Sequence, residues 1–213
     1  MTTETMTIHK ALAELKILES RIMKTVGDGT YCVANKHSNE KIKGVSIEDY
    51  KKVMQSAYDK AVDLITRYKT IKKAVTLSNA KTVVKIGEEE YTVAEAIWMK
   101  NHGVEFDELL LNELREQYNK AQAKILKQNG NDLEQRAEQY VVGIYGSKEG
   151  KTNTDDFEKT KQDFITSQTF ELVDPIGILE KIEVLEEKIS VFKAEVDAVL
   201  STSNALTVVE INY

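Results

Sequence analysis

Cysteine, proline and long apolar runs are scarce in this chain of 213 residues. Cys32 is the only cysteine, so no disulfide can form within the chain, and we expect an ordinary buried or loop thiol there. The single proline and ten glycines leave long stretches without a helix breaker. The longest uninterrupted aliphatic stretch is Leu109 to Leu111, far too short for a membrane span. Met1 to Thr7 has neither a basic nor an apolar region, so no signal peptide is expected.

The chain also has no excess of positive charge. The formal net charge is −6, and no basic stripe is evident along the sequence. Proteins that bind nucleic acid concentrate lysine and arginine on one face, so we predict no nucleic-acid partner. Hydrophobic residues make up 41% of the chain, which is enough for a core, and the charged fraction of 30% suits exposed helix faces.

Recognisable catalytic and metal-binding patterns are absent too. The only histidines are His9, His37 and His102. None is spaced from another histidine or from the cysteine as metal ligands are. Gly150-Lys151-Thr152 resembles the end of a phosphate-binding loop, but Tyr145 stands where that motif needs its first glycine. The acidic residues lie in runs such as Glu88 to Glu90 that suit solvated surfaces. We therefore predict that the protein is not an enzyme and holds no cofactor or metal.

Helical periodicity is what the sequence has in abundance. Within residues 46–76 the apolar residues recur at alternating steps of four and three, which is a heptad seam without a break. Residues 178–199 repeat this rhythm. The seam positions where we expect helices to pack are Tyr50, Met54, Leu64, Tyr68, Ile71, Ile182, Leu185, Ile189, Phe192 and Val196. These seams predict a mainly α fold built as a long antiparallel helical hairpin or coiled-coil bundle. They close either within one chain or between chains.

Helix-start signals and β-branched stretches predict the remaining elements. Ser46 is expected to cap the helix that contains the first seam, and Asp174 with Pro175 the helix that contains the second. The other predicted helices cover roughly 7–26, 92–129 with a break at Gly103, 131–144 and 154–168. Short strands are predicted at about 82–91, 169–173 and 205–211, and we expect them to pair into one small β element. No linker divides the chain, so residues 1–213 are predicted to form a single domain.

The apolar row of the helix after Gly103 has its own pattern. It resumes at Phe106, Leu110, Leu114, Tyr118, Ala121 and Ile125. Trp98 lies on the same predicted helix, before the glycine, and is expected in a core or an interface.

The order of several short segments resembles a known family. They are ALAELKILESRI (Ala11 to Ile22), LITRYK (Leu64 to Lys69), SNAKT (Ser78 to Thr82), YTVAEAI (Tyr91 to Ile97), VDPIGILEKI (Val173 to Ile182) and SNALT (Ser203 to Thr207). This order is similar to that of the septicolysin-like family of small, mainly helical proteins from bacteria and their phages. The resemblance implies a helical bundle with a small β element, and it brings no catalytic residue with it.

Together these observations predict a non-enzymatic structural or assembly protein. The resemblance implies a phage-encoded virion component, made in the host cytoplasm and carried in the virion. Its expected partners are further copies of the chain, as a homo-oligomer, or other virion proteins. Two alternatives remain open. One is a phage protein that sequesters a small ligand such as a nucleotide signal between subunits, with Trp98, tyrosines and lysines as lining. The other is a membrane-active protein, as the family name suggests.

Overall fold

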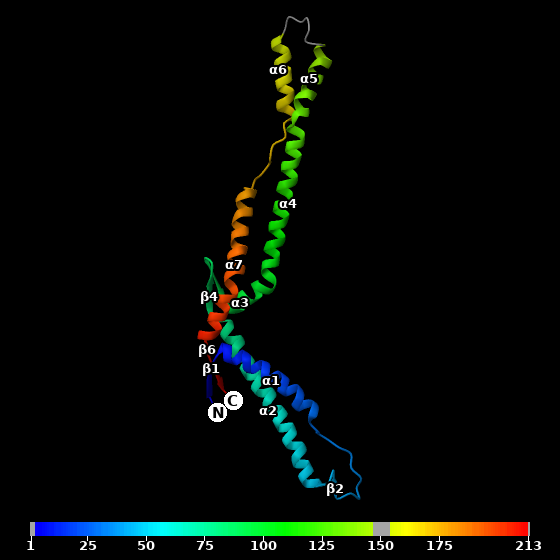
Figure 1. Ribbon diagram of the computed structural model, residues 1–213, viewed down its shortest axis with the longest axis vertical. Helices are drawn as coiled ribbons and strands as arrows, with labels where there is room; N and C mark the ends of the chain where they lie inside the picture. The colour runs from blue at the N-terminus through cyan, green and yellow to red at the C-terminus, as the bar shows by residue number, and fades with distance from the viewer. Residues whose placement is uncertain (1–2, 147–153, 213) are drawn as a thin grey trace. The chain divides into compact units, whose positions relative to one another are not determined.

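The computed structural model describes residues 3–146 and 154–212. Helices dominate these residues, and the strands form small two-stranded sheets (Figure 1). The mainly α fold predicted from the heptads is confirmed. Internal contacts divide the chain into two compact units. Unit 1 comprises Met1–His102 with Val191–Tyr213, and unit 2 comprises Gly103–Ser190. That the chain folds as a single domain stays a prediction.

Two helices form the body of unit 1, α1 (Ile8–Asp28) and α2 (Ile47–Asn79). The segment between them contains the hairpin of β2 (Lys41–Ile42) and β3 (Val45–Ser46), and the helices lie side by side (Figure 1). Both helices begin at a hydroxyl cap. The Thr7 hydroxyl accepts the backbone N–H of Lys10 at 3.2 Å, and the Ser46 hydroxyl accepts that of Asp49 at 3.2 Å. The start predicted at Ser46 is confirmed.

The core of unit 1 lies between this helix pair and a ribbon made by the two ends of the chain. Strand β1 (Thr3–Thr7) pairs antiparallel with β6 (Val208–Asn212). The alternation of the ribbon turns Met6, Val209 and Ile211 inward. They pack with a set of buried helical residues, which are Ile8, Ala11, Leu15, Leu18, Ile71 and Val75. The C-terminal part of the α2 seam therefore closes within the chain.

A second part of unit 1 gathers around the end of α7. The hairpin of β4 (Val83–Ile86) and β5 (Glu89–Thr92) leads into α3 (Val93–Trp98) and the π-helical turn η1 (Met99–Gly103), which ends at the predicted break. Helix α7 (Ile178–Leu206) contributes residues from Val191 onward. The rings of Phe192 and Tyr91 meet edge to face at 5.6 Å between centroids. Lys100 pairs with Asp197 at 2.5 Å.

Unit 2 contains α4 (Val104–Asn129), α5 (Asn131–Tyr145), α6 (Thr154–Gln168) and the first part of α7. An ion pair between Arg115 and Glu186 joins α4 to α7. The buried residues of these two helices in unit 2 are Val104, Leu111, Ile182 and Ile189. Helices α5 and α6 lie side by side (Figure 1), and their buried residues are Leu133, Ala137, Val141 and Phe157.

The predicted β element is partly wrong. The hairpin near 82–91 forms, but the strand predicted at 205–211 pairs with Thr3–Thr7 in a different sheet. Residues 169–173 are irregular instead of extended into a strand. The side chain of Asn129 accepts the N–H of Phe170 at 2.8 Å and donates to its carbonyl at 2.7 Å. This amide satisfies the peptide groups that a neighbouring strand would otherwise bind.

The start of α7 differs from the prediction by one turn. The helix begins at Ile178 instead of next to Pro175, and Gly177 precedes it with φ of +67°. Asp174 still acts at this helix end, because its carboxylate accepts the N–H of Ile178 at 2.8 Å. The positive φ lets the chain turn before the helix begins.

Candidate functional site

The predicted seam residues lie inside the described units. Tyr50, Ile71, Ile182, Ile189, Phe192 and Val196 are buried, and Met54, Leu64, Tyr68 and Leu185 are half-buried. Leu64, Tyr68 and Ile71 belong to the core of unit 1, and Tyr91 covers Phe192. These side chains have partners within the chain, so their use between chains stays a prediction.

Side chains able to do chemistry are dispersed over the surface. His9, His37, His102 and Cys32 are exposed. Within residues 3–146 and 154–212, no cluster of histidine, cysteine and acidic side chains is arranged to hold a metal ion. Across the same residues, no helix has the length and apolar character to cross a membrane. Gly150 to Thr152, the loop compared with a phosphate-binding motif, lies outside the described residues.

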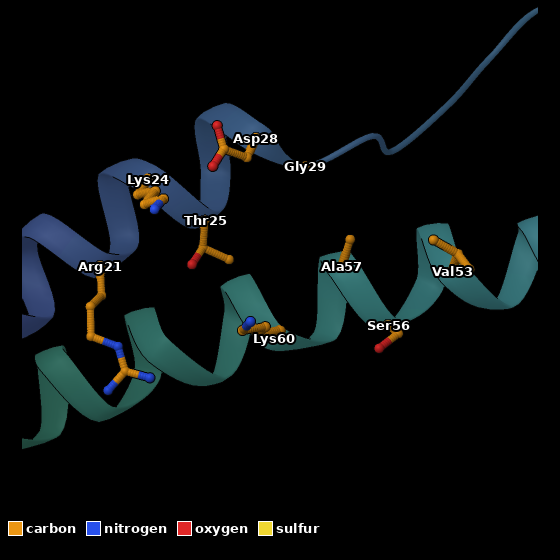
Figure 2. Close-up of a pocket in the computed structure, with 9 residues that line it drawn as sticks. All are labelled: Arg21, Lys24, Thr25, Asp28, Gly29, Val53, Ser56, Ala57 and Lys60. Carbon is orange, nitrogen blue, oxygen red and sulfur yellow. The ribbon is translucent and has the colours of Figure 1, made fainter.

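A groove opens between the last turns of α1 and the facing part of α2. Its volume is about 530 Å³, and it is lined by Arg21, Lys24, Thr25, Asp28, Gly29, Val53, Ser56, Ala57 and Lys60. A small side chain helps to create the space, since Ala57 carries only a methyl group on the side of α2 that faces α1. Figure 2 shows Arg21 reaching from α1 toward α2 and Ala57 pointing from α2 toward α1.

The end of α1 beside this groove is fixed by Tyr31. Its hydroxyl donates to the carbonyl oxygens of Thr25 at 3.3 Å and Val26 at 3.1 Å. These carbonyls belong to the last helical turn, whose acceptors have no partner within the helix. The tyrosine therefore stabilises the turn that presents Lys24 and Thr25 to the groove.

Cations predominate among the charged residues that line this groove. Arg21, Lys24 and Lys60 line it, and none of the three forms an ion pair with another of the described residues. Asp28 is the acidic residue of this lining. In a chain of net charge −6, such a cluster of uncompensated cations is a local reversal of the overall charge.

The groove continues along α2 into a second hollow of about 480 Å³. The two hollows share Arg21, Ser56 and Lys60, and the second extends to Asp63 and Leu64. We call the whole depression, between Lys52 and Leu64 of α2 and the C-terminal half of α1, the α1–α2 groove. At a rise of 1.5 Å per residue, it follows α2 for about 18 Å.

A second surface lies on the N-terminal part of α4. Phe106, Leu109 and Leu110 are 65%, 68% and 52% exposed, and their spacing of three and four places them on one side of the helix. The residues that pack inward are Val104 and Leu111, so Phe106 and Leu110, the first members of the apolar row predicted from the sequence, face solvent instead of the core. We call Phe106, Leu109 and Leu110, together with Glu105 and Glu113, the α4 face.

This helical segment is strongly acidic. From Val104 to Leu114 the acidic residues are Glu105, Asp107, Glu108 and Glu113, and the segment contains no lysine or arginine. An apolar row flanked by acids differs from an ordinary solvated helix face, which mixes both signs of charge. The α4 face can be recognised from the sequence, because its apolar spacing and its excess of acidic residues both lie within one short segment.

The groove, in contrast, was missed by the sequence reasoning. Arg21 and Lys24 lie on one helix and Lys60 on another, with the β2–β3 hairpin between them in the chain. Nothing in the spacing of these residues shows that they meet.

Comparison with known proteins adds no assignment: the chain matches no known protein family, no curated protein and no solved structure. The resemblance to the septicolysin-like family stays a prediction.

Proposed function

We propose that this protein is a non-enzymatic structural protein that works by assembling with further copies of itself. The observation that carries the proposal is the α4 face, where three large apolar side chains at helical spacing face water. Contiguous exposed apolar side chains rimmed by polar groups are typical of protein–protein contacts. Burial of each such side chain contributes about 1.5–3 kcal/mol. Part of that gain is offset by the entropy lost on association.

An outer apolar row on α2 supports the same proposal. Tyr58 and Val62 are exposed and Ile65 is half-buried, at spacings of four and three. They lie apart from the seam that packs on α1, since that seam contains Ala61 and Leu64 instead. Each unit thus presents its own apolar row to solvent.

We extend the proposal to docking on a larger particle. A surface that binds a second copy of the chain is also able to bind other proteins of an assembly. Because of the family resemblance, we propose that this assembly is a phage virion. If the gene lies in a phage genome, mass spectrometry of the purified virion tests this part. The chain is expected among the virion proteins, and its absence from washed virions would contradict the virion role.

Self-association is tested by light scattering coupled to size exclusion, over concentrations from low to several hundred micromolar. The expected mass exceeds the chain mass of 24.1 kDa and rises with concentration. The triple variant Phe106→Ser, Leu109→Ser and Leu110→Ser is expected to shift the mass toward one chain. Leu126→Ser is the matched control, because Leu126 is exposed on the same helix but lies beyond the α4 face. A wild-type mass of one chain at every concentration would refute the proposal.

A further inference from the structure

We propose that the α4 face of one copy binds in the α1–α2 groove of a second copy. This inference rests on the proposed self-association and names the two surfaces that meet. They differ in sequence and in shape, so the contact is heterologous: each copy offers one groove and one face.

The dimensions of the two surfaces agree. The groove follows α2 for about 18 Å, which accommodates roughly three turns of a helix. The α4 face runs from Glu105 to Glu113, or about 12 Å along its axis. An open groove between two helices is a recurrent way to bind an amphipathic helix, whereas small-molecule pockets enclose most of their ligand.

The charges of the two surfaces are complementary. Arg21, Lys24 and Lys60 line the first hollow of the groove, and the α4 face carries Glu105 and Glu113 with no cation from Val104 to Leu114. Asp28 is the one acid of the first hollow, while the acids Asp59 and Asp63 line the second together with Lys52. The glutamates of a bound helix therefore meet a net positive charge at the first hollow.

The same charges argue against pairing of the α4 face with its own copy. A symmetric contact between two such faces would place Glu105 and Glu113 near the same carboxylates of the partner. Like charges in a contact oppose association, while the groove offers cations without ion-pair partners among the described residues.

The apolar parts of the two surfaces also match. Val53 is exposed beside the groove and Leu64 is half-buried at its other end, with Ala57 between them. The short side chain of Ala57 leaves room for a ring such as that of Phe106. Burial of this ring removes from water one of the most exposed apolar side chains of unit 2.

A heterologous contact has a distinctive consequence. Each copy that binds through its groove still presents a free α4 face, so addition continues until a ring closes or a filament grows. A variant with a defective groove and a variant with a defective face still share one intact contact. Their mixture therefore stops at a dimer.

The experiment uses these two variants of the full chain. The groove variant is Arg21→Glu with Lys24→Glu, and the face variant is Phe106→Ser with Leu109→Ser and Leu110→Ser. Each alone is expected to have the mass of one chain under conditions in which the wild type assembles. The equimolar mixture is expected to have twice the chain mass of 24.1 kDa and no larger species. Lys10→Glu with Lys16→Glu, an equal charge change at exposed positions of α1, is expected to assemble as the wild type does.

Three results would overturn this inference while self-association stands: a groove variant that assembles like the wild type, a mixture that stays at one chain mass, or an equal loss of assembly in the Lys10 and Lys16 control. A wild type that never assembles refutes the self-association itself. Circular dichroism and the thermal midpoint confirm that each variant is folded. A further variant, Glu105→Lys with Glu113→Lys, is expected to grow beyond a dimer when it is mixed with the groove variant, because its reversed face binds the reversed groove in addition to the one contact that stays intact.

The alternative occupant, a small anion, is examined with the same variants. If the mixture stays at one chain mass, and inorganic pyrophosphate or ATP raises the thermal midpoint of the wild type but not of the groove variant, the groove is an anion site and the proposed contact is wrong.

Discussion

The guanidinium of Arg67 on α2 donates a hydrogen bond from Nε to Oε1 of Glu14 on α1 at 2.5 Å. Its Nη2 reaches Oε2 of Glu4 on β1 at 3.0 Å. The side chains of Arg67, Glu14 and Glu4 are 27%, 23% and 31% exposed, so water screens these pairs less than it screens surface pairs. One side chain thus joins three elements of unit 1.

Replacement of Arg67 by alanine is expected to lower the free energy of unfolding by about 1–3 kcal/mol, since two partly buried carboxylates lose charged hydrogen bonds. Urea denaturation measures the change. Lys52→Ala, which removes an exposed pair with Asp49, is the control and is expected to cost less than about 0.5 kcal/mol. Equal stability of the two variants would show that the Arg67 pairs contribute no more than a surface pair.

Gly87 and Gly44 form a matched pair for a backbone prediction. Both have positive φ, +59° and +80°, but a Cβ at Gly87 would lie 2.9 Å from Cγ1 of Val191, whereas nothing lies within 4 Å at Gly44. Each alanine variant loses about 1–2 kcal/mol to the left-handed backbone conformation. Gly87→Ala is expected to lose more than Gly44→Ala, because Val191 must also move. A thermal midpoint of Gly87→Ala at or above that of Gly44→Ala would contradict the close packing on α7.

The seam of α2 predicts a contrast within one helix. Ile71 is fully buried in the core of unit 1, and Leu77 is 51% exposed on the same helix. Ile71→Ala is expected to cost about 2–5 kcal/mol through lost burial and the cavity that it leaves. Leu77→Ala is expected to change the free energy of unfolding by less than about 0.5 kcal/mol. Comparable losses, measured by urea denaturation, would show that Ile71 does not face the core.

Glu95 predicts how stability depends on pH. The backbone N–H and the hydroxyl of Thr92 donate to its carboxylate at the start of α3, and they hold the pKa of Glu95 below its ordinary value of 4.5. A pKa lowered by folding gives a stabilisation that is present above the unfolded value and is lost as the pH falls through the folded pKa. The wild type is therefore expected to be more stable than Glu95→Gln near neutral pH, with the difference shrinking below pH 4.5.

Denaturation midpoints of both proteins over this pH range measure the effect. Glu19→Gln, at an exposed position of α1, serves as the control. A difference between wild type and Glu95→Gln that stays constant down to the acidic end would show that the charge of Glu95 does not stabilise the cap.

The parts of the fold that sequence reasoning found are those set by neighbours within a few turns. The heptad of α2 and the cap at Ser46 depend on residues three or four positions apart, and both are present in the structure. Strand β1 was missed because its stability comes from β6 at the other end of the chain, and because Met6 is the one large apolar residue among Thr3–Thr7. Strand pairing over such a distance leaves no local pattern.

The two candidate surfaces also differ in whether they depend on residues close together in the sequence. The α4 face is readable from Val104 to Leu114, since an apolar row and acids without a cation occur within one stretch. The groove is not readable, because Arg21 and Lys60 become neighbours only when α1 and α2 pack. The space between them depends on small residues such as Ala57, whose size has meaning only against the facing helix.

The pairing of β1 with β6 sets the order in which the polypeptide can acquire its structure during translation. Val209 and Ile211 complete the interior that Ile8 and Ile71 enter, so this interior stays open to water until β6 has been synthesised and has left the ribosome. All residues of unit 2 have been synthesised before that moment. The helices of unit 2 are therefore free to fold first on the nascent chain. The hydrophobic faces of α1 and α2 become fully buried only later, when β6 packs on them.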